Sequence, residues 1–290
     1  MKFAVIGGDR RAAILSALLA EDGHGVRSYA LEKGELPKSV QQAGCLQSAV
    51  YGADWVVLPV PAESGSQIRT PLSLQELKSE DLLAVLWPGQ VLCGGALAPE
   101  TSLGAVRAGL AVYDLMRRRD FTVSNAAVTA EGAAQLLMHS SPKCLWGSHV
   151  LVTGWGRIAS ILAPKLKALG AYVTVAARKT GDRAMAEAQG MGSCRFEELP
   201  LILEDVDFVV NTVPAPVLDA GMLALLKPDT VLLELASAPG GFDRAAAAMR
   251  GLKAVHAPGL PGTVSPYTAA ELIRDTIYTI IREREDSHGG

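Results

Sequence analysis

The stretch HVLVTGWGRIASILAPKLKALG, residues 149–170, joins a short apolar run to a helical pattern through two glycines. Gly154, Gly156 and Ala159 have the G-x-G-x-x-G/A spacing of the strand-to-helix turn in a dinucleotide-binding βα unit. The first glycine permits the tight turn, and the second lets the backbone approach a pyrophosphate, which the free N–H groups of the helix N-terminus then bind. The predicted nucleotide contacts of this turn are Gly154, Trp155, Gly156, Arg157 and Ile158.

The strand pattern that follows, YVTVAARK at residues 172–179, indicates which nucleotide binds. Sites for NAD place an Asp or Glu at the end of this strand, where its carboxylate binds the ribose 2′-hydroxyl. This chain has Ala177 at that position, followed by Arg178 and Lys179. A 2′-phosphate would meet no negative charge there, and the planar guanidinium of arginine suits phosphate oxygens. We therefore predict that the cofactor is NADP, bound in part by Arg178 and Lys179.

In three later segments an apolar run is followed by a loop of small residues and prolines: NTVPAPV, LELASAPGG and HAPGLPGTVSP. Ligands of doubly wound sheets bind outside the carboxyl ends of the strands, near the point where the strand order reverses. An ordinary loop explains each segment alone. Three such loops at strand ends, together with the glycine turn, favour a nicotinamide site. The predicted contacts from these loops are Asn211, Thr212, Val213, Pro214, Ala236, Ser237, Pro258 and Leu260.

A second glycine turn, AVIGGDRRAA at residues 4–13, also joins an apolar run to a helical pattern. Gly7 and Gly8 are adjacent, so this turn lacks the dinucleotide spacing. Asp9 stands where a bound phosphate requires the absence of negative charge, and we therefore expect no nucleotide here. The glycines still allow a ligand to approach the backbone closely, and Arg10 and Arg11 at the helix start are able to reach an anion.

Short apolar runs alternate with longer helical patterns along the whole chain, which is typical of βα units on parallel sheets. The expected strands of the first half are 3–6, 26–29, 55–58, 83–85, 91–93 and 111–114, with helices at 11–22 and 72–78. Those of the second half are 149–153, 172–176, 208–212, 231–235 and 254–256, with helices at 158–169, 183–189 and 220–225. The sequence thus predicts an α/β fold of two parallel-sheet βα domains, the C-terminal one a Rossmann domain that binds NAD(P).

The Ala-rich stretch 126–138 is helical by propensity, and Ser140, Ser141 and Pro142 after it favour a helix end. We place the domain change here. The expected parts are an N-terminal α/β domain at 1–124, a linking helix at 125–143 and the Rossmann domain at 144–267. The final segment, 268–290, has apolar residues at helical spacing, and we expect it to pack back across the domain boundary.

Composition excludes several other classes of protein. The net charge of −3 and the lack of a polybasic block argue against nucleic-acid or membrane partners. No apolar run approaches the roughly 18 residues of a membrane span, and the N-terminus lacks a signal-peptide pattern. The four cysteines are scattered without a C-x-x-C pair, so we expect no metal site. These features predict a cytoplasmic enzyme.

Five segments together resemble the family of dipicolinate synthase A subunits: VIGGDRR, NAAVTAEGAAQLLM, GWGRIA, NTVPAPV and APGLPGTVSPYTA. The resemblance runs in order over nearly the whole chain and is far more specific than any single motif. It implies a family-specific N-terminal domain before the Rossmann domain, and a separate partner, a flavoprotein-like B subunit. It also implies the oxidation of dihydrodipicolinate, formed from 4-hydroxytetrahydrodipicolinate by loss of water, to dipicolinate in the mother cell of a sporulating bacterium.

The implied substrate is a small cyclic dicarboxylate, which requires cations, hydroxyl groups and backbone N–H groups as partners. We expect these to lie in a cleft between the domains and to include Asp9, Arg10, Arg11, Asn125, Thr129 and Glu131. Asn125 and Thr129 are expected to open the linking helix, although helix capping explains them equally well. Asp9 either orients an arginine or accepts the ring proton, and no residue is assigned as the catalytic acid or base.

We expect the chain to form a homo-oligomer. Two alternatives to this function remain open. The chain could be another NADP-dependent two-domain dehydrogenase, such as a 2-hydroxyacid dehydrogenase, but it shows no convincing Glu–His pair for that chemistry. It could also be a polypeptide that binds NADP without catalysing a reaction.

The oxidation of dihydrodipicolinate is favourable because the ring becomes aromatic. The protein therefore mainly has to align the substrate with the nicotinamide.

Overall fold

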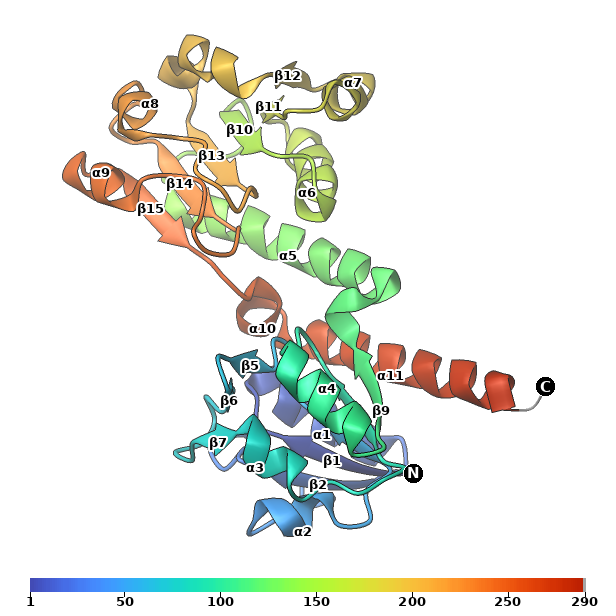
Figure 1. Ribbon diagram of the computed structural model, residues 1–290. Helices are drawn as coiled ribbons and strands as arrows, with labels where there is room; N and C mark the ends of the chain where they lie inside the picture. The colour runs from blue at the N-terminus through green and yellow to red at the C-terminus, as the bar shows by residue number, and fades with distance from the viewer. Residues whose placement is uncertain (289–290) are drawn as a thin grey trace. The chain divides into compact units, whose positions relative to one another are not determined.

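The structure, a computed structural model, describes residues 1–288 and divides into two compact units. The first unit consists of Met1–Asn125 together with the segment that begins at Pro261, and the second unit is Ala126–Leu260. Each unit is built on a six-stranded parallel sheet (Figure 1). The predicted fold class, two parallel-sheet α/β domains, is therefore confirmed.

The sheet of the first unit has the strand order β3-β2-β1-β4-β8-β9. Its strands are β1 (Lys2–Ile6), β2 (Gly25–Tyr29), β3 (Val40–Gln42), β4 (Trp55–Val57), β8 (Val91–Gly94) and β9 (Ala111–Asp114). Its helices are α1 (Arg10–Glu21), α2 (Leu46–Val50), α3 (Ser79–Leu83), α4 (Pro99–Arg107), α11 (Pro266–His288) and a 3-10 turn at Leu115–Arg117. A small antiparallel sheet is formed by β5 (Glu63–Ser64), β6 (Gln67–Ile68) and β7 (Leu77–Lys78).

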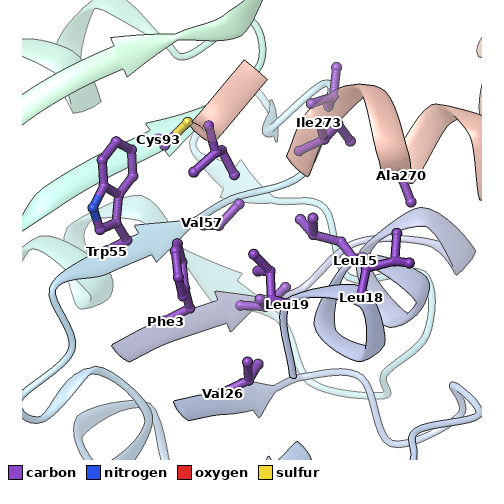
Figure 2. Packing of buried hydrophobic residues seen from close by; sticks show 14 of the residues in the cluster. Phe3, Leu15, Leu18, Leu19, Val26, Trp55, Val57, Cys93, Ala270 and Ile273 are labelled. Atoms are coloured by element: carbon purple, nitrogen blue, oxygen red, sulfur yellow. The ribbon is translucent and has the colours of Figure 1, made fainter. Parts of the chain in front are cut away.

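This sheet is buried on both faces, because successive side chains of a strand point to opposite sides. Along β1, Phe3 and Val5 pack in one core with α1 and α11, whereas Ala4 and Ile6 pack in a second core with α2, α3 and α4. Figure 2 shows Phe3, Leu15 and Ile273 in the first core, contributed by β1, α1 and α11 respectively. The last helix of the chain is thus part of the core of the first unit.

The sheet of the second unit repeats this arrangement with the order β12-β11-β10-β13-β14-β15. Its strands are β10 (His149–Thr153), β11 (Tyr172–Ala176), β12 (Gly192–Cys194), β13 (Phe208–Asn211), β14 (Val231–Glu234) and β15 (Lys253–His256). Its helices are α6 (Arg157–Ala168), α7 (Thr180–Ala188), α8 (Ala220–Ala224) and α9 (Arg244–Met249), with 3-10 turns at Phe196–Leu201 and Leu203–Asp205. The chain passes from the first unit to the second within α5 (Arg119–Ser140) and returns within α10 (Leu260–Val264).

Two predicted elements of the first unit are wrong. Residues 72–78 form a turn and strand β7 rather than a helix; Leu74 is 88% exposed, so the leucines of this stretch share no helical face. Residues 83–85 form the last residue of α3 and the turn after it instead of a strand. Glu80 and Asp81 favour the first turn of this helix.

Candidate functional site

The glycine turn between β10 and α6 opens a helix N-terminus to ligands. Gly154 has a φ of +89°, and an added Cβ would lie 2.8 Å from the Thr212 Oγ1 atom, so the position requires glycine. Gly156 is the N-cap of α6, and an added Cβ there would meet nothing within 4 Å. Trp155 and Ile158 are partly buried, and Arg157 is exposed. The backbone amides at the start of this twelve-residue helix therefore have no side-chain cap, and there is open space beside the N-cap residue.

The turn after β11 presents two cations at the carboxyl end of the sheet. Ala176 and Ala177 are buried, whereas Arg178 and Lys179 are exposed. Arg183 of α7 donates from its Nη1 atom to the carbonyl oxygens of Ala177 and Arg178, at 2.8 and 2.9 Å. Its guanidinium therefore fixes the path of this turn, a role that the strand-end motif alone does not indicate.

Three buried polar side chains meet at the carboxyl ends of β10, β13 and β14. Thr153, Asn211 and Glu234 are each at most 1% exposed. The Thr153 hydroxyl donates to Asn211 Oδ1 at 2.5 Å, and Asn211 Nδ2 donates to Glu234 Oε1 at 2.6 Å. We refer to Thr153, Asn211 and Glu234 as the strand-end cluster. Neither Thr153 nor Glu234 was among the sequence-predicted site residues.

The strand-end cluster gives Asn211 a task other than direct contact with a cofactor. Its Oδ1 atom accepts from the Thr153 hydroxyl and the Val213 N–H, and its Nδ2 atom donates to Val213 and Glu234. With its side chain fully buried and hydrogen-bonded within the protein, Asn211 would contribute to a cofactor site through the loop that it holds. That loop contains Thr212, which is partly buried, and Pro214, which is exposed.

The remaining predicted cofactor contacts lie at the same edge of the sheet. Ala236 is buried and its N–H donates to Glu234 Oε1, while Ser237 is exposed. Pro258 is exposed beyond β15, and Leu260 is buried. His256 lies at the end of β15, with its Nδ1 atom 2.6 Å from Arg244 Nη2. The predicted cofactor residues therefore come from the ends of five parallel strands, on both sides of β10, where the strand order reverses.

The glycine turn between β1 and α1 differs from its counterpart at the helix cap. The amide of the first glycine is bonded in both turns, since the Gly154 N–H donates to the Ala176 carbonyl oxygen at 2.8 Å. Gly7 and Gly8 have φ angles of +64° and +109°, and their N–H groups donate to the carbonyl oxygens of Tyr29 and Arg69, both at 2.8 Å. Asp9 is the N-cap of α1, and its Oδ1 atom accepts from the Arg11 N–H at 3.0 Å. The position that a phosphate would take at this helix is therefore occupied by the carboxylate of Asp9.

Arg11 is buried and bound to its neighbours. Its Nη2 atom lies 2.7 Å from Asp9 Oδ2 and also donates to the Val60 carbonyl oxygen, while its Nε atom donates to Asp9 Oδ1 at 3.0 Å. Burial alone would raise the pKa of Asp9, but the hydrogen bonds and charge of Arg11 outweigh it and hold that pKa below its usual range. An added Cβ at Gly262 would lie 2.8 Å from both Arg11 Nε and Asp9 Oδ2, so the start of the C-terminal segment is packed on this pair.

Arg10 is the cation of this turn that remains available to a ligand. It is exposed and makes no salt bridge within residues 1–288. Together with Lys33 and Glu35 it lines a surface pocket of about 310 Å³ in the first unit. Arg10 and Arg11, predicted as equivalent, therefore differ: one faces a pocket and the other is held by Asp9.

The predicted substrate residues of the linking helix lie in the interior of α5 and not at its start. Because α5 begins at Arg119, Asn125, Thr129 and Glu131 lie in its interior, and the expectation that the first two open a helix is wrong. Asn125 belongs to the first unit, and Thr129 and Glu131 to the second. Glu131 Oε1 accepts a hydrogen bond from the Lys165 Nζ atom of α6 at 2.9 Å, an exposed ion pair within the second unit.

No helix within residues 1–288 is both long and apolar enough to cross a membrane. Over the same residues, no group of three or more His, Cys, Asp or Glu side chains is placed to hold a metal ion.

Comparison with known proteins assigns both halves of the chain. Residues 2–116 match the family of N-terminal domains of the dipicolinate synthase A subunit. Residues 111–245 match the family "D-isomer specific 2-hydroxyacid dehydrogenase, NAD binding domain". The second unit is therefore a dehydrogenase-type domain for a nicotinamide dinucleotide.

One relative and two solved structures, each matched over nearly the whole chain, share one description. The chain is 30% identical to the dipicolinate synthase A subunit of Bacillus subtilis (strain 168), over 100% of its length and 98% of the relative. Crystal structures of this type of protein superpose with a TM-score of 0.85 for Bacillus halodurans (28% identity, 96% and 97% of the two chains covered) and 0.83 for Bacillus subtilis (29% identity, 99% and 97%). On this full-length similarity, the chain belongs to the family of dipicolinate synthase A subunits.

Proposed function

We propose that this chain is an NADP-dependent dehydrogenase that oxidises dihydrodipicolinate to dipicolinate. The observation that carries the proposal is its full-length similarity to the dipicolinate synthase A subunit, with a nicotinamide-dinucleotide domain in its second unit. In the balanced step, the dihydropyridine ring loses a hydride and a proton and becomes an aromatic pyridine. NADP⁺ accepts the hydride and becomes NADPH, and the proton goes to water or to a nearby carboxylate.

The second unit has the features that a dinucleotide requires. Open space at Gly156 and the uncapped start of α6 suit a pyrophosphate, since helix N-termini bind anions through their free N–H groups. Arg178 and Lys179 are exposed at the end of β11, where a carboxylate would otherwise select NAD. We therefore propose that Arg178, with Lys179, binds the 2′-phosphate and makes the enzyme specific for NADP.

In the first unit, we propose that Arg10 binds a carboxylate of the substrate. Arg10 and Lys33 bring two cations to one pocket, and two carboxylates are what a cyclic dicarboxylate presents. Asp9 would then act on Arg11 rather than on the substrate, because its oxygens are hydrogen-bonded to the Arg11 side chain. Asn125, Thr129 and Glu131 lie in the interior of α5, so we propose for them no contact through a helix N-terminus.

The description of the Bacillus subtilis relative as one of the subunits of a synthase supports a further proposal about assembly. We propose that the chain works with a second polypeptide, the flavoprotein-like B subunit that the family resemblance implies, and that it forms homo-oligomers. The reaction would take place in the cytoplasm of a sporulating mother cell.

The direct test is an assay of NADPH absorbance with 4-hydroxytetrahydrodipicolinate, NADP⁺ and the chain, with and without the B subunit. The proposal predicts that NADPH and dipicolinate appear in equal amounts, and that NAD⁺ supports a much slower reaction. Binding of NADP⁺ without turnover in the presence of both subunits would favour a non-catalytic NADP-binding role. Turnover of a 2-hydroxy acid in place of the cyclic substrate would favour another two-domain dehydrogenase.

A further inference from the structure

The strand-end cluster is unusual because it places a carboxyl group in the interior of the second unit. Glu234 ends β14 and is 1% exposed, yet no cation is bonded to it among the described residues. Its Oε1 atom accepts from Asn211 Nδ2 at 2.6 Å and from the Ala236 N–H at 2.9 Å, and its Oε2 atom accepts from the Gly241 N–H at 2.7 Å. The carboxyl group therefore joins a side chain of β13 to two backbone amides of the loop after β14.

Such a cluster is poorly explained by stability alone. Burying polar groups costs free energy that well-packed apolar side chains would avoid, and buried ionic groups are often replaceable without loss of stability. A fully hydrogen-bonded network does, however, fix one arrangement of the segments that it joins. No buried side-chain nitrogen or oxygen within residues 1–288 lacks a hydrogen-bond partner, so the network is complete.

The loop after β14 is packed tightly on this network. An added Cβ at Gly241 would lie 2.2 Å from the Asn211 side chain, and one at Gly240 would lie 2.9 Å from Glu234 Oε2. Both glycines are buried. A side chain at either glycine would therefore collide with Asn211 or Glu234, so the backbone of the loop lies directly against the cluster.

The network also reaches the glycine turn of the nucleotide site. Asn211 accepts from the Val213 N–H at 3.2 Å, and the adjacent Thr212 hydroxyl donates to the Thr153 carbonyl oxygen at 2.7 Å. Thr212 and Val213 in turn limit the space at Gly154, where an added Cβ would lie 2.8 and 2.9 Å from their side chains. A continuous series of contacts thus leads from Glu234 through Asn211 to the first glycine of the turn.

We propose that Glu234 is a positioning residue for the nicotinamide half of the dinucleotide. It acts through Asn211 and two backbone amides, which set the loops after β13 and β14 relative to the glycine turn. We expect its effect to fall on the nicotinamide half of the ligand, because the loops that it holds follow β13 and β14, whereas the adenosine 2′-phosphate is proposed to bind on the other side of β10, at the end of β11. The inference rests on the proposed use of this unit as the NADP site.

The test compares binding of two probes, NADP⁺ and adenosine 2′,5′-bisphosphate, to the full-length chain by calorimetry. For Glu234→Gln, in which an amide N–H₂ replaces an acceptor oxygen, we expect about tenfold weaker NADP⁺ binding. We expect the bisphosphate, which lacks the nicotinamide half, to bind within about twofold of its wild-type affinity. A merely structural role would weaken both probes equally.

Thr230→Val is the matched control at the other end of the same strand. Thr230 is fully buried just before β14, and its hydroxyl donates to the Val206 carbonyl oxygen at 3.0 Å. The control should lower the melting temperature of the second unit and leave the affinity for both probes unchanged. Loss of NADP⁺ affinity in this control to the same extent as in Glu234→Gln would overturn the inference.

Thr153→Val provides a milder variant that keeps the inference falsifiable if Glu234→Gln does not fold. It removes only the hydroxyl that donates to Asn211, and we expect a smaller loss of NADP⁺ affinity with the bisphosphate affinity unchanged. Wild-type affinity for NADP⁺ in Thr153→Val, or in a folded Glu234→Gln, would overturn the inference. Failure of the wild-type chain to bind either probe would instead contradict the proposed function.

Discussion

The two sheets share one strand order, and in each the first strand leads through a glycine turn into the first helix. At α1 the N-cap is Asp9, whose carboxylate accepts from a backbone amide and from Arg11. At α6 the N-cap is Gly156, which leaves the space above the helix N-terminus open. At α1 a side chain of the protein thus satisfies a backbone amide of the first turn, whereas at α6 no side chain does so, and uncapped helix N-termini are suited to anions.

The second difference between the turns lies in how their arginines are held. Arg11 is bonded within the first unit, and Gly262 is packed on its ion pair with Asp9. Arg178 is exposed, and it is Arg183 that holds the backbone beneath it. In the first turn Arg11 is thus tied into its unit, whereas in the second Arg178 is exposed above a backbone that Arg183 holds.

The largest expected effect is on cofactor choice at the second turn. Replacing Arg178 by Asp (Arg178→Asp) removes a cation and adds a charge that repels the 2′-phosphate, so we expect about hundredfold weaker NADP⁺ binding. Binding of NAD⁺ should change by less than about threefold. Calorimetric titration with both cofactors measures this, and Arg250→Asp, a reversal at another exposed arginine of the unit, is the control. Equal weakening of NAD⁺ and NADP⁺ by Arg178→Asp would contradict the assignment.

The next effect separates the two neighbouring arginines of the first turn. Arg11→Ala leaves the Asp9 carboxylate and the Val60 carbonyl oxygen without their partner, and should lower the free energy of unfolding of the first unit by about 2 kcal/mol. Arg10→Ala should change it by less than about 0.5 kcal/mol, because the side chain is exposed. Thermal unfolding checks both values. A larger loss of unfolding free energy in Arg10→Ala than in Arg11→Ala would contradict the roles given to the two residues.

A glycine exchange in each unit sharpens the same contrast. Gly262→Ala places a methyl group against Arg11 and Asp9, and should cost about 1–2 kcal/mol of stability. Gly156→Ala meets open space and should cost under about 1 kcal/mol, yet weaken NADP⁺ about tenfold by covering the helix amides. Melting temperature and cofactor affinity are measured for both variants. Wild-type affinity for NADP⁺ in Gly156→Ala would contradict the proposal that the start of α6 binds the dinucleotide.

The smallest expected effect concerns the charge of Asp9. Arg11 holds the pKa of Asp9 in the folded protein below the ordinary aspartate value, so the pair stabilises the first unit fully above about pH 4 and loses this contribution as the pH falls through the lowered pKa. Asp9→Asn keeps a capping side chain but removes the titration. Melting curves should therefore show a shallower loss of stability in acid for Asp9→Asn than for the wild type. Identical slopes in the two proteins would show that this pair does not titrate as described.

Much of this architecture follows from local patterns. The alternation of apolar runs and the G-x-G-x-x-A spacing predict two parallel sheets and a Rossmann unit, because small residues are required where a strand turns into a helix. The unfavourable place of Asp9 for a phosphate is also visible in the sequence, and the structure shows the helix cap that explains it. Local signals fail where neighbours decide: α5 begins at Arg119, ahead of the Ala-rich stretch that marks a helix.

The missed residues depend on contacts between distant segments. Glu234 is the last residue of the strand VLLE, and only the fold brings Asn211 and the Gly241 amide to it. A carboxylate that directly ends an apolar strand is the signal that would have drawn attention to it. Arg183 lies one helical turn into α7, and its bond to the Arg178 carbonyl oxygen depends on the path of the preceding turn.

The central claim is that the dinucleotide binds at the second glycine turn and not at the first. Hydrogen–deuterium exchange of the full-length chain, with and without saturating NADP⁺, tests it directly. We predict slower exchange in peptides that cover Gly154–Ser160 and unchanged exchange in peptides that cover Gly7–Ala13. Protection at Gly7–Ala13 without protection at Gly154–Ser160 would contradict the claim.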